Sequence, residues 1–483
     1  MISPYLIESF QRLGESVSSA TLRVVKNTHE VLTIRNDIPV PPTFAEAQGY
    51  MITVWDGGGV GYGSSSDFSP EGIASAFHAA KTWANFGQRH FVYDFSKIDY
   101  AHERAHFQGG LSNQDSWFDK SWTQKIELLH PLCSEMKISD RIVMREVGVH
   151  AHRMHSMLIS TQGAQIFQEI DRITPSLLVS AGNGKGDFET RSFGKGNLCW
   201  QGGIEALVRQ GYFAAASHLA HEAEALLAAP SCPVGTFDLL LAPDQMVLQI
   251  HESIGHPLEL DRILGDERNY AGTSFVTLDM FGKYQYGSDL LNITFDPTVP
   301  GEIASYSHDD EGTPAEKTYL IENGLLKRAL GGLSSQARAK GIEGVACARS
   351  CNWNRPAIDR MANLNLEPGN SSQEDLIGRI EKGVWMQTNS SWSIDDSRNK
   401  FQFGCEMAYW VENGKVKHLL RKPNYRGISR DFWRNLIGVG NEQTSKVMGS
   451  PYCGKGEPNQ SIYVGHRSPT CLFRAIEVFG GGQ

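Results

Sequence analysis

The residues best suited to metal chemistry are two histidines and a glutamate in the segment His251-Glu252-Ser253-Ile254-Gly255-His256. Neutral imidazoles are good zinc ligands, and a catalytic zinc site uses three protein ligands and leaves one position for water. Zinc lowers the pKa of that water to about 7 and polarises a carbonyl group. A carboxylate next to the first ligand can take a proton from the water and pass it to a leaving amine. These residue types therefore predict a zinc-dependent hydrolytic site with Glu252 as the base.

The spacing of the two histidines is unusual. Zinc-binding helices commonly carry His-Glu-x-x-His, because residues four apart share one helix face. Five positions separate the histidines here, which places them about 140° apart around a regular helix. Gly255 is conformationally permissive, and Pro257 disfavours helical backbone at His256. We therefore expect a helix over 245–255, capped by Asp244, that ends at or just before His256 so that this ligand swings back toward the metal.

The third ligand stays open from spacing alone. Glu259 and Asp261 follow the second histidine closely and are candidates. Cys453 is a distant candidate, because Gly454 and Gly456 let the backbone bend near a metal and Lys455 favours a thiolate. For any one of the eight cysteines, however, a buried apolar side chain is a competing explanation.

Two other histidine clusters are present. The segment 102–106 reads His-Glu-Arg-Ala-His and has the commoner spacing, but its flanks are polar and no apolar helix surrounds it. Because a catalytic metal site needs a held and partly dry surrounding, we interpret this segment as a solvated loop or surface helix. His150, His152 and His155 lie in a stretch of alternating polarity, which predicts a polar sheet face.

The elements that must position these residues divide into two halves. In the first half, 21–36 and 50–55 read as strands, the glycines at 57–59 as a hairpin turn, Pro70 as the start of a helix, 141–160 as another strand and 203–229 as one long helix. The segment Pro230-Ser231-Cys232-Pro233 marks a boundary, so we predict domains over 1–232 and 233–483. The second half is rich in strands, with a strand at 237–241 and Asn-Gly hairpins at 319–326 and 408–416.

Length, charge and cysteine usage exclude several classes. A chain of 483 residues is too long for one ordinary core, and two to three domains are expected. The net charge of −9 and the pI of about 6.0 give no general attraction to nucleic acid. The chain has no apolar stretch long enough for a membrane helix and no secretory signal. Eight scattered cysteines without a CxxC pair favour reduced thiols and a cytoplasmic location.

Taken together, these motifs resemble those of the TldD/PmbA family of metallopeptidases, on the active TldD side. Beyond the His251–His256 block and Cys453-Gly454-Lys455, the resemblance rests on segments that come in the family's order over nearly the whole length: 56–61 (DGGGVG), 271–274 (AGTS), 309–314 (DDEGTP), 320–324 (LIENG) and 360–363 (RMAN).

This resemblance implies an α+β fold: an N-terminal α/β domain with a curved antiparallel sheet and helices, and a C-terminal sheet-rich, barrel-like metallopeptidase domain. It implies Zn²⁺ bound by His251, His256 and Cys453, with Glu259 and Asp261 orienting the ligands. It also implies unfolded or extended peptides as substrates, held by strand addition, and a dimer, either a homodimer or a heterodimer with a paralogous subunit that lacks the motif.

The chain departs from the family pattern at two places. The stretch after the cysteine reads Val464-Gly465-His466-Arg467-Ser468-Pro469-Thr470 where the family often ends in Gln-Pro-Thr, and Pro257 stands where glycine is common. We expect these changes to alter cleft shape and specificity but not the metal site. The alternative function is a non-cleaving regulatory or scaffolding subunit, to which the family's older link with DNA gyrase belongs. A phosphate-binding loop at Gly57–Gly63 is disfavoured, because the segment matches neither a GxGxxG motif nor a P-loop.

Overall fold

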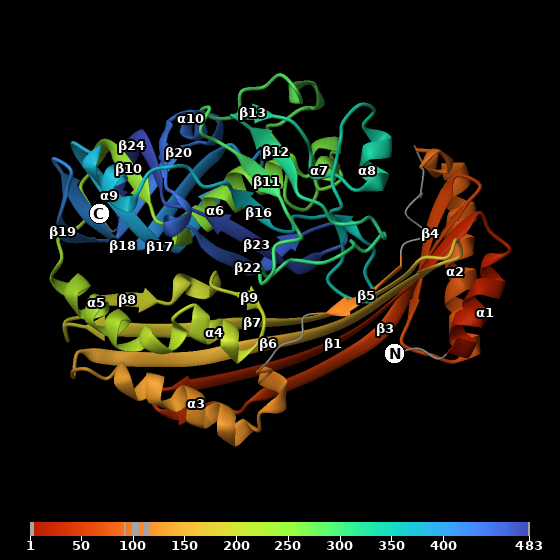
Figure 1. Ribbon diagram of the computed structural model, residues 1–483, viewed down its shortest axis with the longest axis horizontal. Helices are drawn as coiled ribbons and strands as arrows, with labels where there is room; N and C mark the ends of the chain where they lie inside the picture. The colour runs from red at the N-terminus through yellow and green to blue at the C-terminus, as the bar shows by residue number, and fades with distance from the viewer. Residues whose placement is uncertain (1–3, 91–92, 99–105, 111–114, 482–483) are drawn as a thin grey trace.

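A computed structural model gives the structure of residues 4–90, 93–98, 106–110 and 115–481. Figure 1 shows a long curved sheet from the first half of the chain lying beneath the strands and loops of the second half. The chain thus has the α+β class that the sequence predicts. His102 to Ala105 lie outside the described residues, so the structure does not address the His-Glu-x-x-His segment there.

The first sheet is formed by nine strands of the described chain. Its main order is β4-β3-β1-β6-β7-β5, and it is antiparallel except that β5 runs parallel to β7. The strands are β1 (Ser19–Arg35), β2 (Ile38–Pro39), β3 (Thr43–Asp56), β4 (Gly59–Ser65), β5 (His106–Gly110), β6 (Ile142–Ser160), β7 (Gln165–Gly182), β8 (Phe188–Ser192) and β9 (Trp200–Gln201). The curved antiparallel sheet predicted for this half is confirmed, and its strands β1, β6 and β7 are long enough to underlie the whole second half (Figure 1).

The glycine-rich hairpin between β3 and β4 is a packing feature. Gly57 and Gly58 turn the chain with φ of 55° and 85°, as the hairpin interpretation expects. A Cβ atom on Gly59 or Gly61 would lie 2.0 Å from a backbone carbonyl oxygen of the following helix, α2 (Pro70–His90). The glycines therefore let α2 lie directly on strand β4.

The other helices of this half are α1 (Pro4–Gly14), α3 (Trp122–Glu135), α4 (Ile204–Arg209) and α5 (Ala216–Ala228). The prediction of one long helix over 203–229 is wrong, because the segment forms α4 and α5 with a 3₁₀ turn at Tyr212–Ala214 between them. Gly211 has φ of 76°, a left-handed conformation that ends the first helix.

The second half is built on a closed barrel, as the resemblance implies. Strands β10, β17, β18, β20 and β24 pair in a ring, because β24 also pairs with β10. The strands of this sheet are β10 (Gly235–Leu241), β17 (Lys382–Ile394), β18 (Lys400–Glu412), β19 (Lys415–Arg421), β20 (Pro423–Ile428), β21 (Leu436–Val439) and β24 (Cys471–Gly480). Asn413 and Gly414 make the predicted Asn-Gly turn between β18 and β19, with φ of 51° and 68°.

Smaller sheets and short helices surround the barrel. The strands are β11 (Ile293–Phe295), β12 (Thr318–Glu322), β13 (Leu325–Leu326), β14 (Ala348–Arg349), β15 (Ile358–Asp359), β16 (Leu364–Leu366), β22 (Lys446–Lys455) and β23 (Gln460–Ser468), and the helices are α6 (Pro243–Ile250), α7 (Leu260–Leu264), α8 (Leu333–Arg338), α9 (Gln373–Gly378) and α10 (Ser429–Arg434). No helix in the described part of the chain is long and apolar enough to cross a membrane.

The two-stranded ribbon β22–β23 lies where the two halves meet. Tyr463 of β23 stacks on His152 of the first sheet with ring centroids 5.2 Å apart, and the Arg172 guanidinium lies 4.9 Å from the centre of the Tyr463 ring. His29 of the first sheet also stacks on His152, with ring centroids 4.2 Å apart. His152 of β6 therefore contributes to the contact between the two halves, in addition to the polar sheet face that the alternation along β6 predicts.

Candidate metal centre

The two motif histidines are carried by a helix that changes its pitch. Strand β10 runs into α6, whose first residue is Pro243 and whose N-cap is Ala242. The predicted cap, Asp244, is instead in the first turn and accepts a hydrogen bond from Thr388 Oγ1 at 2.5 Å. The cap prediction fails because proline is favoured at the first helical position, which moves the start two residues toward the N-terminus.

From His251 to Gly255 the helix forms a π turn, and the N–H of His256 donates to the carbonyl oxygen of His251. The prediction that the helix ends at or just before His256, with Pro257 taking His256 out of helical backbone, is therefore wrong, because His256 keeps helical backbone (φ −59°, ψ −40°) and opens a 3₁₀ turn through Leu258. A π turn is wider than an α turn and hydrogen-bonds residues five apart, so it brings residue i+5 over residue i. Widening of the helix thus solves the spacing problem.

Gly255 is required where the π turn passes beneath Met361. A Cβ atom at position 255 would lie 2.0 Å from the Met361 sulfur. The Tyr286 hydroxyl donates to the Ser253 carbonyl oxygen at 2.5 Å, and the Trp433 indole donates to Ser253 Oγ at 2.9 Å. Side chains from three other segments therefore hold the π turn in place.

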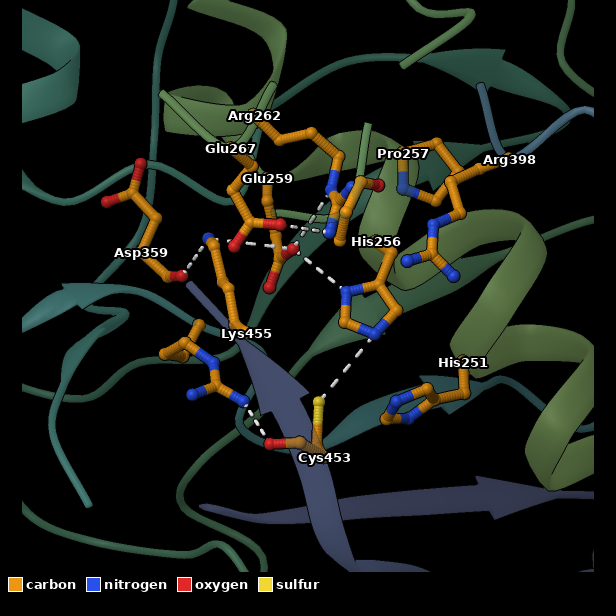
Figure 2. A network of polar contacts seen from close by, with 12 residues as sticks. His251, His256, Pro257, Glu259, Arg262, Glu267, Asp359, Arg398, Cys453 and Lys455 are labelled. Carbon is orange, nitrogen blue, oxygen red and sulfur yellow. Dashed lines mark hydrogen bonds and ion pairs between the residues drawn. The ribbon is translucent and has the colours of Figure 1, made fainter. Parts of the chain in front are cut away.

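His251, His256 and Cys453 come together in the buried interior. One ligand atom from each lies within 4.8 Å of the others, and Cys453 Sγ is 3.7 Å from His256 Nε2. Figure 2 shows the sulfur on the ribbon strand pointing at the His256 ring, with His251 beside it. Cys453 comes from β22, 197 residues further along the chain than His256.

Hydrogen bonds fix which nitrogen of each histidine faces this cluster. His466 Nδ1 is 3.0 Å from the Leu364 carbonyl oxygen, which can only accept, so this nitrogen carries the proton. His466 Nε2 is then an acceptor for His251 Nδ1 at 2.9 Å. His256 Nδ1 donates to Glu259 Oε2 at 2.9 Å. Both motif histidines are therefore held as the tautomer that presents an unprotonated Nε2.

The protonation states match this arrangement. Burial lowers the pKa of His251 and of His256, which keeps both rings neutral. Burial raises the pKa of the Cys453 thiol, but the Arg360 guanidinium and His256 outweigh it, so that the pKa lies below its usual value. Two neutral imidazoles and a thiol inclined to ionise are a suitable donor set for zinc.

Glu259 orients His256, whereas Asp261 forms no hydrogen bond with either motif histidine. Glu259 is fully buried and its pKa lies well below the usual value, because Lys455 and His256 outweigh the effect of burial. Asp261 accepts a hydrogen bond from Lys455 Nζ at 2.6 Å and contacts neither motif histidine. Figure 2 shows Lys455, Glu259 and Arg262 grouped on the side of the His256 ring that faces away from His251. Both carboxylates that spacing nominated as third ligands therefore face away from the cluster and hold His256 or Lys455.

Glu252 is buried beside His251 and forms an ion pair with Arg398. Arg398 Nη1 donates to Glu252 Oε2 at 2.6 Å, and the two side chains are only 14% and 8% exposed. The carboxylate is thus held at the edge of the cluster by a cation that comes from the tip of the β17–β18 hairpin.

The geometry of the cluster fits a zinc ion. In a tetrahedral site with Zn–N and Zn–S bonds of about 2.1 and 2.3 Å, nitrogen and sulfur ligand atoms lie about 3.6 Å apart. The separation between His256 Nε2 and Cys453 Sγ is 3.7 Å. Cys453 and His256 therefore already stand at a zinc-binding separation, and the ligand atom of His251 lies within 4.8 Å of both.

Sequence reasoning missed three residues of this centre. His466 supports His251, Arg398 pairs with Glu252, and the buried Arg360 donates to the Cys453 carbonyl oxygen. His466 lies in the unusual stretch 464–470, which we expected to alter cleft shape and specificity but not the metal site, and it contacts a motif histidine directly. The unusual histidine itself was the available signal.

Comparisons with known proteins point to one family. The sequence profile described as "PmbA/TldA metallopeptidase C-terminal domain" matches residues 234–480, and the one described as "PmbA/TldA metallopeptidase domain 1" matches residues 20–84. The first match alone spans more than half of the chain, including His251, His256 and Cys453.

Curated relatives carry related names. A protein named metalloprotease from Methanothermobacter thermautotrophicus is 29% identical over 341 residues, which are 71% of each chain. A protein named zinc metalloprotease TldD homolog from Saccharolobus solfataricus is 28% identical over 51% of this chain and 52% of that relative. Matches to other curated metalloproteases also span about half of those relatives, 54% and 48% in two cases.

Solved structures share the fold over the whole length. A crystal structure from Thermotoga maritima, described as a putative modulator of a DNA gyrase, aligns with a TM-score of 0.75 over 98% of this chain and 99% of that one. Sequence identity in this alignment is 18%, so the likeness concerns the fold alone.

Proposed function

Because this chain belongs to the PmbA/TldD metallopeptidase family, we propose that it is a zinc-dependent peptidase that hydrolyses peptide bonds in unfolded or extended peptides. In this proposal His251, His256 and Cys453 hold the zinc. The observation that carries it is the approach of these three side chains within 4.8 Å, with both histidines presenting Nε2. A relative named zinc metalloprotease supports the choice of metal.

The protein groups divide the chemistry between them. Bound zinc supplies Lewis acidity, which acidifies water and polarises a carbonyl group. Glu252 is the general base: its carboxylate accepts a proton from water and delivers it to the amine of the departing peptide. Burial of both ligand histidines and of Glu252 excludes bulk water and strengthens the electrostatic interactions among these groups.

Glu252→Gln tests this role directly. Glutamine keeps the size of the side chain but cannot accept the proton, so peptide cleavage should fall by about 10²–10⁴-fold or more. Zinc content should stay at the wild-type value, because Glu252 is not a ligand. The measurements are turnover of an unstructured fluorogenic peptide library and metal analysis of the same samples.

Glu322→Gln is a matched control, because Glu322 is half-exposed on the Asn-Gly hairpin β12–β13, away from the cluster. Full activity in Glu252→Gln would refute the assigned role. If wild type and Glu252→Gln behave alike because neither cleaves any peptide, the alternative of a non-cleaving regulatory or scaffolding subunit takes precedence.

The remaining parts of the proposal concern organisation. We propose a division between domains 1–232 and 233–483, supported by a family profile that begins at residue 234.

We propose that the protein is a dimer, either a homodimer or a heterodimer with a paralogous subunit that lacks the motif. We also propose a cytoplasmic location, supported by eight free thiols. The proposed partners are peptide substrates. We propose no binding to nucleic acid or membranes, in keeping with the net charge of −9. Strand addition is supported by an edge of the first sheet, since β5 ends the order of its described strands.

A further inference from the structure

Arg398 reaches the proposed base from a distant part of the fold. It lies in the turn between β17 and β18, 146 residues from Glu252, and its Nη1 is 2.6 Å from Glu252 Oε2. Figure 2 shows the guanidinium group on the same side of the cluster as His251. The chain has therefore brought a cation from the barrel hairpin to the edge of the metal centre.

The backbone of this arginine is held in an unfavourable conformation. Arg398 has φ of 63°, a left-handed conformation that costs free energy for any residue except glycine. The Asp395 carboxylate caps the turn by accepting from the N–H groups of Asn399 at 2.7 Å and Lys400 at 3.0 Å. Conformations of this kind persist where the surroundings over-determine them, and they gather at functional sites.

The hairpin tip is also docked on both sides. On one side, the N–H groups of Thr273 and Phe275 donate to the carbonyl oxygens of Asp396 and Ser397 at 2.9 and 2.8 Å. A Cβ atom on Gly272 would lie 2.5 Å from Asp396, so this approach needs glycine.

On the other side, Ser429 Oγ donates to the Arg398 carbonyl oxygen at 3.0 Å. The segment 273–275 is itself fixed to the metal centre, because Ser274 Oγ donates to the Pro257 carbonyl oxygen at 2.7 Å. Arg398 is thus fixed relative to the residue that follows His256.

The contact with Glu252 uses one oxygen only. Arginine and carboxylate commonly meet through two parallel hydrogen bonds. Here a single bond joins Nη1 to Oε2, and Arg398 Nε is buried without a partner among the described residues. Within the described chain no side chain donates to Oε1 of Glu252. One carboxylate oxygen is therefore clamped and the other is left available.

Charge neutralisation alone does not account for this arrangement. A buried carboxylate needs a cation, and any nearby cation, such as a lysine, would supply that charge. A strained and doubly docked arginine that holds one chosen oxygen points to control of orientation. The spare oxygen is the atom that the proposed general base requires.

We propose that Arg398 is the positioning residue of the catalytic base: it holds Glu252 by Oε2 and turns Oε1 to the position where it accepts the proton. This role rests on the proposed peptidase function and adds to it a residue that the metal-binding motif does not contain. Arg398 acts through Glu252 and contacts none of the three proposed metal ligands by a hydrogen bond.

The kinetic test compares Arg398→Met and Arg398→Lys with wild type in the full-length, zinc-loaded chain. Methionine keeps the apolar stem but cannot donate a hydrogen bond to Glu252 Oε2. We therefore expect kcat to fall about 100-fold while KM stays within about threefold. Lys restores the charge without the planar donor group and should recover only part of the lost kcat. Zinc affinity, measured by chelator competition, should be unchanged in both variants.

Arg430→Met is the matched control, because Arg430 is 56% exposed on the neighbouring helix α10. An active wild type together with an equally active Arg398→Met would overturn the role of Arg398 and leave the proposed function standing. An inactive wild type would instead reject the proposed function.

A second measurement avoids activity altogether. Unfolding midpoints are compared for wild type, Arg398→Met, Glu252→Gln and the double variant, all in chelator-treated protein. Arg398→Met should lower the midpoint in the wild-type background, where it leaves Glu252 buried and unpaired, and lower it clearly less in the Glu252→Gln background. Equal decreases in both backgrounds would show that Arg398 does not act through Glu252 and would overturn the proposal.

Discussion

At the scale of single residues, the centre is organised by which nitrogen of each histidine carries a proton. The Leu364 carbonyl oxygen sets the tautomer of His466, and His466 sets the tautomer of His251. Glu259 does the same for His256. Each motif histidine therefore has a hydrogen-bond partner on the side away from the cluster, the usual arrangement for histidines that bind metals.

His466→Leu should weaken zinc binding by about 10–100-fold, because His251 Nδ1–H loses its acceptor and the ring is free to change tautomer or rotate. His466→Gln should lose less, since its amide oxygen can accept that hydrogen bond. Zinc affinity is measured by competition with a chromophoric chelator. His218→Leu, at a histidine whose side chain is 76% exposed, is the control. Wild-type affinity in His466→Leu would mean that the hydrogen bond to His251 has no role in metal binding.

The sequence predicts the residues of the centre unevenly. His251, Glu252 and His256 follow from residue type and local spacing. Cys453 needs the family resemblance, because its own segment with Gly454, Lys455 and Gly456 makes it a candidate but does not choose it over Glu259 and Asp261. His466 stands out in the sequence as an unusual residue, but its role and that of Arg398 could not be predicted, since their partners lie 215 and 146 residues away and only the fold brings them together.

At the scale of elements, the decisive feature is the π turn at His251–Gly255. The five-residue spacing signals that a regular helix cannot serve both ligands, and that inference is sound. The sequence does not reveal the solution, because glycine followed by His-Pro is compatible with an ended helix and with a widened one. Packing decides: Met361, Tyr286 and Trp433 enclose the turn and favour the wider helix.

Gly255→Ala should destabilise the protein by about 1–3 kcal/mol, because the new Cβ meets the Met361 sulfur in a filled interior. The displaced turn should also weaken zinc binding. Chemical denaturation and chelator competition measure the two effects. Gly454→Ala is a control next to Cys453, since its Cβ would meet nothing within 4 Å. If Gly255→Ala proves as stable as Gly454→Ala, the close contact at position 255 does not constrain the turn.

At the scale of the whole molecule, the ribbon β22–β23 joins the metal centre to the long sheet. Cys453 and His466 of this ribbon contact the motif histidines, while Tyr463 packs against His152 and Arg172 of the first half. The alternation of side chains along a strand makes this two-sided role possible. The centre therefore depends on the docking of both halves, although all of its predicted residues lie in the second half.

The architecture is more predictable than these contacts. Alternating polarity at 21–36 and 141–160 and the Asn-Gly turns predict strands and hairpins that the structure contains. Closure of the barrel through β10 and β24 is not visible locally, because those strands pair across most of the second half. The long helix predicted over 203–229 fails because one glycine in a left-handed conformation outweighs a favourable composition.

The central claim is that a thiolate from β22 joins two histidines of the π turn around one zinc ion. X-ray absorption at the zinc edge of the purified, full-length chain loaded with one equivalent of zinc measures the ligand set directly. We predict one sulfur at about 2.3 Å and two imidazole nitrogens at about 2.0–2.1 Å, with the sulfur contribution lost in Cys453→Ala. A wild-type spectrum with only nitrogen and oxygen neighbours, or a sulfur contribution that survives in Cys453→Ala, would contradict the claim.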